Sequence, residues 1–187
     1  MNEVLRQEKK YPIDLAQGAA LRARLDQIMR RDAHNGAQGY TIRSLYFDTP
    51  DDEDFHDKVD GLELRRKLRL RAYSPDADFA MLEMKQKEGP YQKKRSLRLS
   101  REDAVRLCQG DYGPLKSYPD PFAGECYGLM ACRCYRPKAI VEYLRQAYLA
   151  QENHIRITLD SRITTTETCF VLFSARLPQF PMMDPFR

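Results

Sequence analysis

The sequence lacks any long run of apolar residues. No segment approaches the roughly eighteen apolar residues that indicate a membrane-spanning helix. The first residues, MNEVLRQEKKYPI, have no apolar stretch after their basic side chains, so no secretory signal is predicted. Both absences favour a cytoplasmic protein.

The motifs of the common nucleotide-binding folds are also missing. The chain has neither the G-x-x-x-x-G-K-[ST] pattern of a P-loop nor the G-x-G-x-x-G pattern of a dinucleotide-binding unit. Its three histidines, His34, His56 and His154, stand apart from any nucleophile pattern. The sequence therefore predicts neither of these nucleotide-binding folds and no histidine-activated nucleophile.

The cysteines indicate reduced thiols and not a disulfide framework. Their number is odd and no export signal precedes them. A zinc site could be built only from Cys126, Cys132 and Cys134 with His154, and their spacing matches no C-x2-C pattern. We expect unligated thiols at all five positions: Cys108, Cys126, Cys132, Cys134 and Cys169.

The overall charge is nearly balanced. The 31 Lys and Arg residues exceed the 27 Asp and Glu residues by a formal net charge of +4, which is too small to predict a nucleic-acid-binding protein. A chain of 187 residues can bury a substantial core, and no internal repeat or long linker divides it. We expect a single domain over residues 1–187, in which the positions of the basic residues matter more than their number.

Strand patterns outnumber helix patterns along the chain. Runs rich in β-forming residues predict strands over residues 3–13, 40–48, 62–73, 78–87, 91–99, 138–149, 154–163 and 166–174. Helices are predicted after the N-cap residues Asp14 and Ser100 and through 121–134, and the polar run 51–58 is expected to form a turn. Consecutive strands favour an α+β domain with an antiparallel sheet, closed or nearly closed into a barrel of about eight strands with a few flanking helices.

Basic side chains gather on one face of several predicted strands. Side chains alternate along a strand, so one face of 62–73 is basic and the other carries leucine and alanine. The basic positions that share a face within their strands are Arg65, Lys67, Arg69 and Arg71, then Lys85 and Lys87, then Lys93 and Arg95. A solvated outer face is the alternative. Like charges about 6.6 Å apart repel each other, however, and phosphate is the polyanion group that Arg and Lys bind best.

Acidic residues interrupt these basic faces. Glu8 lies between Arg6 and Lys10, and Glu83 comes shortly before Lys85. The acids could form internal ion pairs that keep the basic residues from repelling one another. They could instead bind Mg²⁺ or Mn²⁺ together with substrate phosphates, where the ion would neutralise charge that develops in phosphoryl transfer.

Eight short motifs, in order along the chain, carry a resemblance to a known family. They are R-x-E-x-K-Y from Arg6, S-L-Y-F-D-T from Ser44, F-x-x-K-V-D-G from Phe55, K-x-R-x-R-x-Y from Lys67, L-E-M-K from Leu82, K-x-R from Lys93, V-E-Y-x-R-x-A-Y from Val141 and R-I-T-L-D from Arg156. The series resembles the VTC domain, which is the polyphosphate polymerase domain of the triphosphate tunnel metalloenzyme, or CYTH-like, superfamily. It extends from about residue 3 to residue 174.

The resemblance implies an antiparallel β-tunnel that transfers the γ-phosphate of ATP to a polyphosphate chain with Mn²⁺ or Mg²⁺. By matched position, the expected catalytic residues are Lys10, Arg69, Arg71, Lys85 and Arg145. Further substrate-binding residues are expected at Arg6, Lys67, Lys87, Lys93, Arg95 and Arg156. Glu8 matches an acid that binds metal in hydrolase relatives, and Glu83 is the second expected metal ligand.

The end of the sequence departs from the family pattern. Relatives continue with an L-E-x-K-Y strand, whose Glu is the principal metal ligand, and with a helix that carries a Ser-Lys pair. Nothing after Phe173 matches either element. We therefore expect a C-terminally incomplete domain with an exposed sheet edge that could pair with a second copy.

Three other functions stay open beside an ATP-dependent polyphosphate polymerase. A metal-dependent triphosphatase would use the same scaffold, although Arg6 stands where the hydrolases carry the first Glu of E-x-E-x-K. A non-catalytic module would bind polyphosphate or inositol polyphosphate. An RNA-binding β-protein would use the basic groove without sequence-specific recognition. The eukaryotic relatives also imply a membrane-protein partner.

Overall fold

The computed structural model describes residues 4–6, 8–89, 91–152 and 155–182, with side chains from residue 8 onward. The elements in chain order are β1 (Val4–Arg6), α1 (Leu15–Ile28), β2 (Arg30–Arg31), β3 (Tyr40–Asp48), α2 (Glu53–Val59), β4 (Leu64–Ala72), β5 (Phe79–Glu88), β6 (Tyr91–Ser100), α3 (Arg101–Cys108), the 3₁₀ turn η1 (Gly113–Ser117), α4 (Pro121–Cys132), β7 (Arg136–Leu149), β8 (Arg156–Thr166) and β9 (Phe180–Pro181). No helix in these ranges is both long and apolar enough to cross a membrane.

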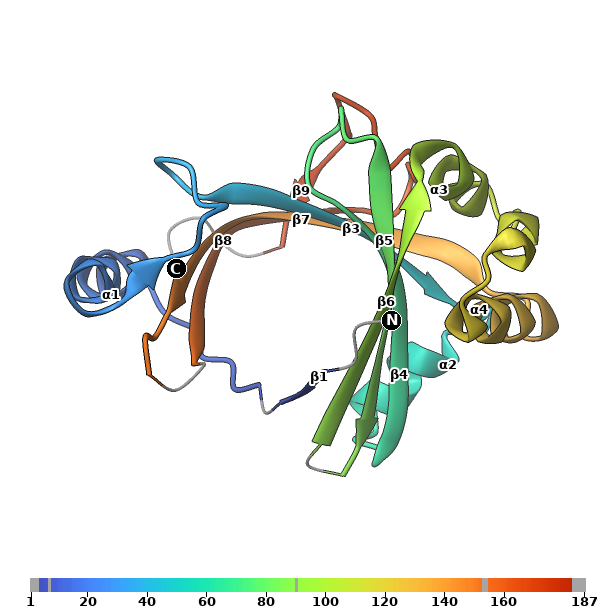
Figure 1. Ribbon diagram of the computed structural model, residues 1–187, viewed down its shortest axis with the longest axis horizontal. Helices are drawn as coiled ribbons and strands as arrows, with labels where there is room; N and C mark the ends of the chain where they lie inside the picture. Colours follow the sequence, from blue (N-terminus) through green and yellow to red (C-terminus); the bar gives the residue numbers. More distant parts are fainter. Residues whose placement is uncertain (1–3, 7, 90, 153–154, 183–187) are drawn as a thin grey trace.

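One curved antiparallel sheet is the frame of the molecule (Figure 1). Its strand order is β1-β6-β5-β4-β3-β7-β8-β9, and β2 pairs with β7. β1 and β9 stand at the two ends of this order, and no pairing joins them within the described residues. Residues 8–14, which have no regular structure, cross the open side of the arch on the way to α1. The α+β antiparallel architecture is confirmed, whereas closure of the sheet into a barrel is not.

The hydrophobic core lies on the convex face of the sheet. α3 and α4 lie outside the arch beside β5 and β6 (Figure 1). Alternate side chains of β4 and β5, including Leu70 and Leu82, are fully buried in one cluster with Leu107 of α3 and Phe122 of α4. Burial of apolar side chains is the main favourable contribution to folding. Because this burial occupies the convex face, the alternate polar side chains of the same strands are left on the concave face.

Side-chain caps set the beginnings of three helices. The carboxylate of Asp14 accepts a hydrogen bond from the backbone N–H of Gln17, whose side chain bonds back to the Asp14 N–H in a capping box. Ser100 caps α3 in the same position, and Asp120 caps α4 one residue before Pro121. The N-caps predicted at Asp14 and Ser100 are confirmed.

Most of the run 51–58 lies in helix α2, which spans Glu53–Val59, so the predicted turn is wrong there. The carboxylate of Asp48, at the end of β3, accepts hydrogen bonds from the backbone N–H groups of Thr49, Asp54 and Phe55 at 2.7–3.0 Å. These donors include N–H groups of the first helical turn, which have no partner within a helix. A carboxylate from outside the run therefore makes the short helix stable, and the local composition gives no sign of it.

The predicted strand over 166–174 is also wrong. β8 ends at Thr166, and the following segment packs irregularly on the convex face, where Leu172 and Phe173 join the core. The guanidinium of Arg43 satisfies this backbone, because its Nη1 donates to the carbonyl oxygens of Leu172 at 2.9 Å and Ser174 at 2.6 Å. A buried side chain thus supplies the hydrogen bonds that a neighbouring strand would otherwise make. The strand predicted at 3–13 is likewise shorter, because only Val4–Arg6 pairs with β6.

The buried carboxyl of Asp54 in α2 is expected to make the stability of the protein depend on pH. Burial raises the pKa of its carboxyl to about 6, although Tyr135 donates a hydrogen bond to it. The folded state therefore holds a proton that the unfolded state releases near pH 4, so stability falls as the pH rises from about 4 to about 6. We expect the free energy of unfolding of Asp54→Asn, minus that of the wild type, to increase by roughly 2 kcal/mol across this window. Urea titrations at several pH values would measure it beside the exposed control Asp51→Asn, and a difference for Asp54→Asn that stays flat would contradict it.

Candidate functional site

The concave face of the sheet carries a band of cations from adjacent strands. On β4, Lys67, Arg69 and Arg71 alternate with the buried Leu68 and Leu70. The strand pairing sets them beside residues of β5, since Arg69 lies opposite Glu83 and Lys67 lies opposite Lys85. On the next strand, β6, Lys94 lies opposite Lys85. Residues that face each other across antiparallel strands share one side of the sheet. We call this set (Lys67, Arg69, Arg71, Lys85 and Lys94) the concave cation band.

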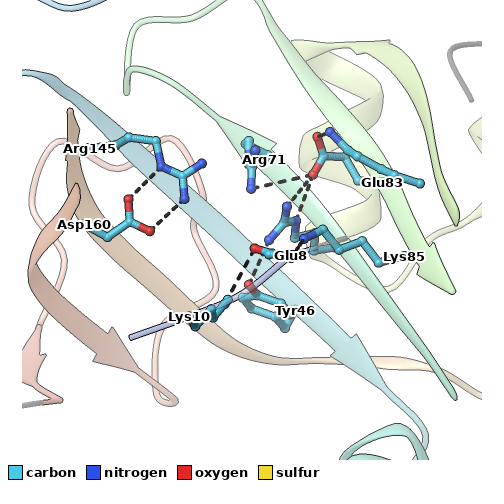
Figure 2. Close-up of polar contacts among 10 residues, drawn as sticks. Glu8, Lys10, Tyr46, Arg71, Glu83, Lys85, Arg145 and Asp160 are labelled. Atoms are coloured by element: carbon cyan, nitrogen blue, oxygen red, sulfur yellow. Dashed lines mark hydrogen bonds and ion pairs between the residues drawn. The ribbon is translucent and has the colours of Figure 1, made fainter. Parts of the chain in front are cut away.

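Glu83 is the counter-ion at the centre of the band (Figure 2). Its Oε2 accepts hydrogen bonds from Nη2 of Arg69 at 2.7 Å and from Nε of Arg69 at 2.9 Å, and it lies 3.7 Å from Nη2 of Arg71. Its Oε1 lies 2.5 Å from Nζ of Lys94. Burial by itself would raise the pKa of this carboxyl, but the neighbouring cations Arg69, Arg71 and Lys94 outweigh it and lower the pKa to about 2. Glu83 is therefore ionised and held by cations on both oxygens.

Glu8 enters the band from the segment that crosses the open side of the arch (Figure 2). Its Oε2 accepts a hydrogen bond from Nζ of Lys85 at 3.0 Å, and its Oε1 lies 4.0 Å from Nζ of Lys10. Burial lowers the pKa of Lys85, and the bond to Glu8 offsets part of that effect. Residues from the first ten positions thus complete a face built mainly by β4 to β6.

Arg145 extends the site onto β7 (Figure 2). Its Nε and Nη2 each donate to one carboxylate oxygen of Asp160 on β8 at 2.7 Å, a two-pronged geometry. Tyr143 lies on the same face of β7 and interacts electrostatically with both Arg71 and Arg145. The basic surface therefore continues from the concave cation band across β3 to β7 and β8.

Tyr46 is a member of the site that the sequence prediction did not assign to it. Its hydroxyl accepts a hydrogen bond from Nη1 of Arg69 at 3.0 Å. Burial opposes ionisation of Tyr46, but Arg69, Arg71 and Lys67 together lower its pKa below the usual value. A signal was present, because Tyr46 stands in the S-L-Y-F-D-T motif two residues before Asp48, on the face opposite the buried Leu45 and Phe47.

Lys93 and Arg95 lie on the convex face, away from the concave cation band. Arg95 contacts Glu125 of α4 and stacks its guanidinium over the ring of Phe122 at 4.9 Å. Lys94 takes the place on the concave face that the prediction gave to its two neighbours. The alternation relative to Leu97 and Leu99, which pack in the core, could have identified Lys94 from the sequence. The placement of Lys93 and Arg95 in the basic face is therefore corrected.

The other predicted site residues lie toward the ends of this surface. Lys67 interacts electrostatically with Lys58 and Lys10, so lysines gather at one end of the concave face. The alternation of side chains along β5 places Lys87 at the same end. Arg156 lies toward the other end, where it contacts Asp32 at 2.9 Å and donates to the hydroxyl of Tyr40 at 2.9 Å. The side chain of Arg6 lies outside the described residues, and so does His154.

The neighbouring residues Lys93 and Lys94 allow a sharp test of the face assignment. Lys94→Gln removes a cation from the concave face, and we expect tripolyphosphate binding to weaken roughly tenfold, since one charge-assisted contact contributes about 1.5 kcal/mol. Lys93→Gln changes the same charge one position away and is expected to leave affinity within about twofold. Isothermal titration calorimetry at constant salt would compare the two variants. Equal losses in both would show that total charge, and not the face, controls binding.

The acids on the concave face do not fit a metal site. Within the described residues, no group of three or more His, Cys, Asp or Glu side chains is placed to hold a metal ion. Glu83 has cations on both oxygens, and Glu8 already contacts Lys85 and Lys10. Of the two interpretations of these acids, the contacts support internal ion pairing, and the predicted role of Glu83 as a metal ligand is not supported.

The cysteines show no sign of a zinc site. All five are free thiols, and burial raises the pKa of Cys108 and Cys126 to about 12. Thiols with a raised pKa remain protonated at neutral pH and are poor metal ligands.

Comparison with known proteins identifies the family. A family model for the VTC domain matches residues 5–184. The chain belongs to the VTC domain family. Among solved structures, a Bacillus halodurans protein described as a "putative adenylate cyclase" superposes with a TM-score of 0.54 at 14% sequence identity, covering 89% of this chain and 73% of the other. At that identity the likeness shows a shared fold and nothing finer. No curated protein sequence matches the chain.

Proposed function

We propose that this VTC domain binds ATP and polyphosphate on its concave face and transfers the γ-phosphoryl group of ATP to the end of the polyphosphate chain. The observation that carries the proposal is the concave cation band, in which cations of β4, β5 and β6 face one space. Phosphate oxygens are the natural ligands of such a set, because Arg binds them through two N–H groups and Lys adds a point charge.

The proposed reaction needs positioning and charge neutralisation more than covalent chemistry by the protein. A terminal oxygen of the polyphosphate chain attacks the γ-phosphorus of ATP, the bond from that phosphorus to the β–γ bridging oxygen breaks, and ADP leaves with the electron pair. Arg69, Arg71 and Lys85 would bind the non-reacting oxygens and neutralise the charge that spreads over them. Arg145 would do the same from the opposite side of the concave face.

Family membership and electrostatics support this proposal from different directions. Members of this family are typically metal dependent, and the Bacillus halodurans neighbour is described as a putative adenylate cyclase. In this chain the acids of the basic face are committed to cations. We therefore assign phosphate binding to the Arg and Lys side chains and derive no step through a metal ligand set in the described residues.

A gel assay tests the proposal directly. Purified protein is incubated with ATP labelled on the γ-phosphate, with Mn²⁺ or Mg²⁺ added, and the products are separated by length. A ladder of labelled polyphosphate is expected. Free phosphate without a ladder would show a triphosphatase instead, and the absence of both products, together with tight tripolyphosphate binding, would show a module that only binds.

A binding-only function is the second candidate, and one specific observation favours it. The concave carboxylates Glu83 and Asp160 are each held by arginine, and the described residues supply no further acid cluster on that face. A site built from cations and their counter-ions can bind a polyanion without activating a phosphoryl group. This candidate predicts salt-sensitive binding of polyphosphate or inositol polyphosphate with no turnover when metal is supplied.

A further inference from the structure

The two ends of the concave face have different chemistry. Along β4, the concave positions run from Lys67 through Arg69 and Arg71 to Tyr73, just after the strand. β3 is antiparallel to β4, so its concave positions pass from Tyr46, which lies opposite Arg69, to Tyr40 at the same end as Tyr73. Six residues of strand separate Tyr46 from Tyr40, which is roughly 20 Å. One end is therefore lined by lysines, while aromatic rings gather at the other.

Three rings form the aromatic end. The centroids of Tyr40 and Tyr73 are 6.5 Å apart, and those of Tyr40 and His34 are 6.4 Å apart, with tilted planes in both pairs. Tyr73 is 41% exposed and the His34 side chain is 84% exposed. We call these residues (His34, Tyr40 and Tyr73) the aromatic end cluster. Rings that served only to fill the core would be buried, and the core lies on the other face of the sheet.

Cations join the aromatic end cluster to the centre of the site. Arg145 lies directly opposite Tyr40 in the pairing of β7 with β3. Arg156 donates to the Tyr40 hydroxyl, and the carboxylate of Asp32 holds both Arg156 and the Nδ1 of His34, the latter at 2.8 Å. A ligand with a flat ring at one end and phosphates at the other would meet matching groups: rings with Arg145 beside them at one end, then Arg71 toward the centre.

From this order we infer that the aromatic end cluster binds the base of the nucleotide, so that ATP enters with its adenine at the Tyr40 and Tyr73 end and its phosphates toward Arg145 and Arg71. The inference rests on the proposed function, since it assigns a direction to the substrate of that site. Bases of any kind stack on aromatic side chains, because every base has a π-face. The polyphosphate chain, which has no base, then occupies the lysine end near Lys67.

The test compares two ligands that share a triphosphate group. ATP and inorganic tripolyphosphate are titrated calorimetrically into the full chain at equal salt and Mg²⁺. Tyr73→Ala is expected to weaken ATP binding roughly fivefold to a hundredfold, the range for loss of one stacked base, with tripolyphosphate binding changed less than twofold. Tyr91→Ala, in the β5–β6 hairpin, is the matched control for loss of an exposed tyrosine.

The fluorescence of a nucleotide analogue gives a second readout, which would not change if Tyr73 had only a structural role. The triphosphate of 2-aminopurine riboside is expected to lose fluorescence on binding to the wild type and to recover it in Tyr73→Ala. If Tyr73→Ala weakened the binding of both ligands equally, or of neither, the inferred direction of ATP would be wrong. Tripolyphosphate binding by the wild type would still support the site itself. If neither ligand bound the wild type, the proposed function would fail and the inference with it.

Discussion

Replacing Glu83 by glutamine is expected to lower the free energy of unfolding by about 3–5 kcal/mol, as is typical when one partner of a buried ion pair is removed. Glu83 is 1% exposed, and its carboxylate is shared by Arg69, Arg71 and Lys94. Without that charge, three cations would remain close together on the concave face with no anion among them. Urea denaturation of Glu83→Gln and wild type at neutral pH would measure the difference.

A bound polyanion should rescue the same variant. Tripolyphosphate can supply the negative charge that Glu83→Gln lacks, so its stabilising effect in thermal melts should be larger in the variant than in the wild type. Glu8→Gln is the matched control, because Glu8 is half-exposed and contacts Lys85 and Lys10 at the margin of the band. Its expected cost is below about 1 kcal/mol. If Glu83→Gln were as stable as the wild type and differed only when metal was added, Glu83 would be a metal ligand and the counter-ion role would be wrong.

The pH dependence of this pair follows from the lowered pKa of Glu83. The folded state keeps the carboxylate ionised down to about pH 2, whereas the unfolded chain takes up a proton near pH 4.5. The contribution of Glu83 to stability is therefore complete above about pH 4.5 and is lost as the pH falls toward 2. The stability difference between wild type and Glu83→Gln should shrink over that acidic window, the opposite of the trend expected for Asp54.

Replacing Arg71 by glutamine is expected to weaken tripolyphosphate binding roughly 10- to 150-fold, the equivalent of about 1.5–3 kcal/mol for hydrogen bonds from a charged donor. Arg71 is 7% exposed and lies 3.7 Å from Glu83, the longest of the contacts to that carboxylate. Its buried Nε has no hydrogen-bond acceptor within the described structure. Such a donor is costly to leave unpaired, and a phosphate oxygen would satisfy it.

Arg43 is the matched control for Arg71 because it is equally buried on the neighbouring strand, at 7% exposure, but faces the convex side. Its guanidinium holds Glu142 and the backbone of residues 172 and 174. We expect Arg43→Gln to lower the free energy of unfolding while the folded protein keeps its affinity for tripolyphosphate. Calorimetric titration and urea denaturation of both variants would separate the two roles. Loss of affinity in Arg43→Gln, or full affinity in Arg71→Gln, would contradict the assignment of the site to the concave face.

Much of the concave face could be predicted from the alternation of single strands. In the sequence of β4, LRRKLRLRA, the alternation places Lys67, Arg69 and Arg71 on one side and Leu68 and Leu70 on the other, and the structure keeps that division. The family motifs assigned roles to Glu8, Lys10, Lys85 and Arg145 in the expected site, and the structure brings these together with β4. Their catalytic roles stay predictions until the variants are assayed.

The errors have two physical causes. In β6, two lysines and an arginine are consecutive, so either Lys93 with Arg95 or Lys94 could face inward, and the pairing with β5 decided for Lys94. Helix α2 depends on Asp48, which precedes the run 51–58, and the loop after β8 depends on Arg43, which lies 129 residues before Leu172. Short segments whose backbone hydrogen bonds are made by a side chain outside the segment leave little trace in their own composition.

By itself, the sequence determined which side chains could share a face, because the two-residue period of a strand is a local property of the backbone. The tertiary structure alone decided what each charge meets. Glu83 lies among cations because strand pairing set it opposite Arg69 and brought Lys94 within 2.5 Å of its carboxylate, and Glu8 reached Lys85 across 77 residues of chain. The near-neutral composition likewise concealed a concentrated basic surface, since the electrostatic character of a site depends on distances between charges and not on their sum.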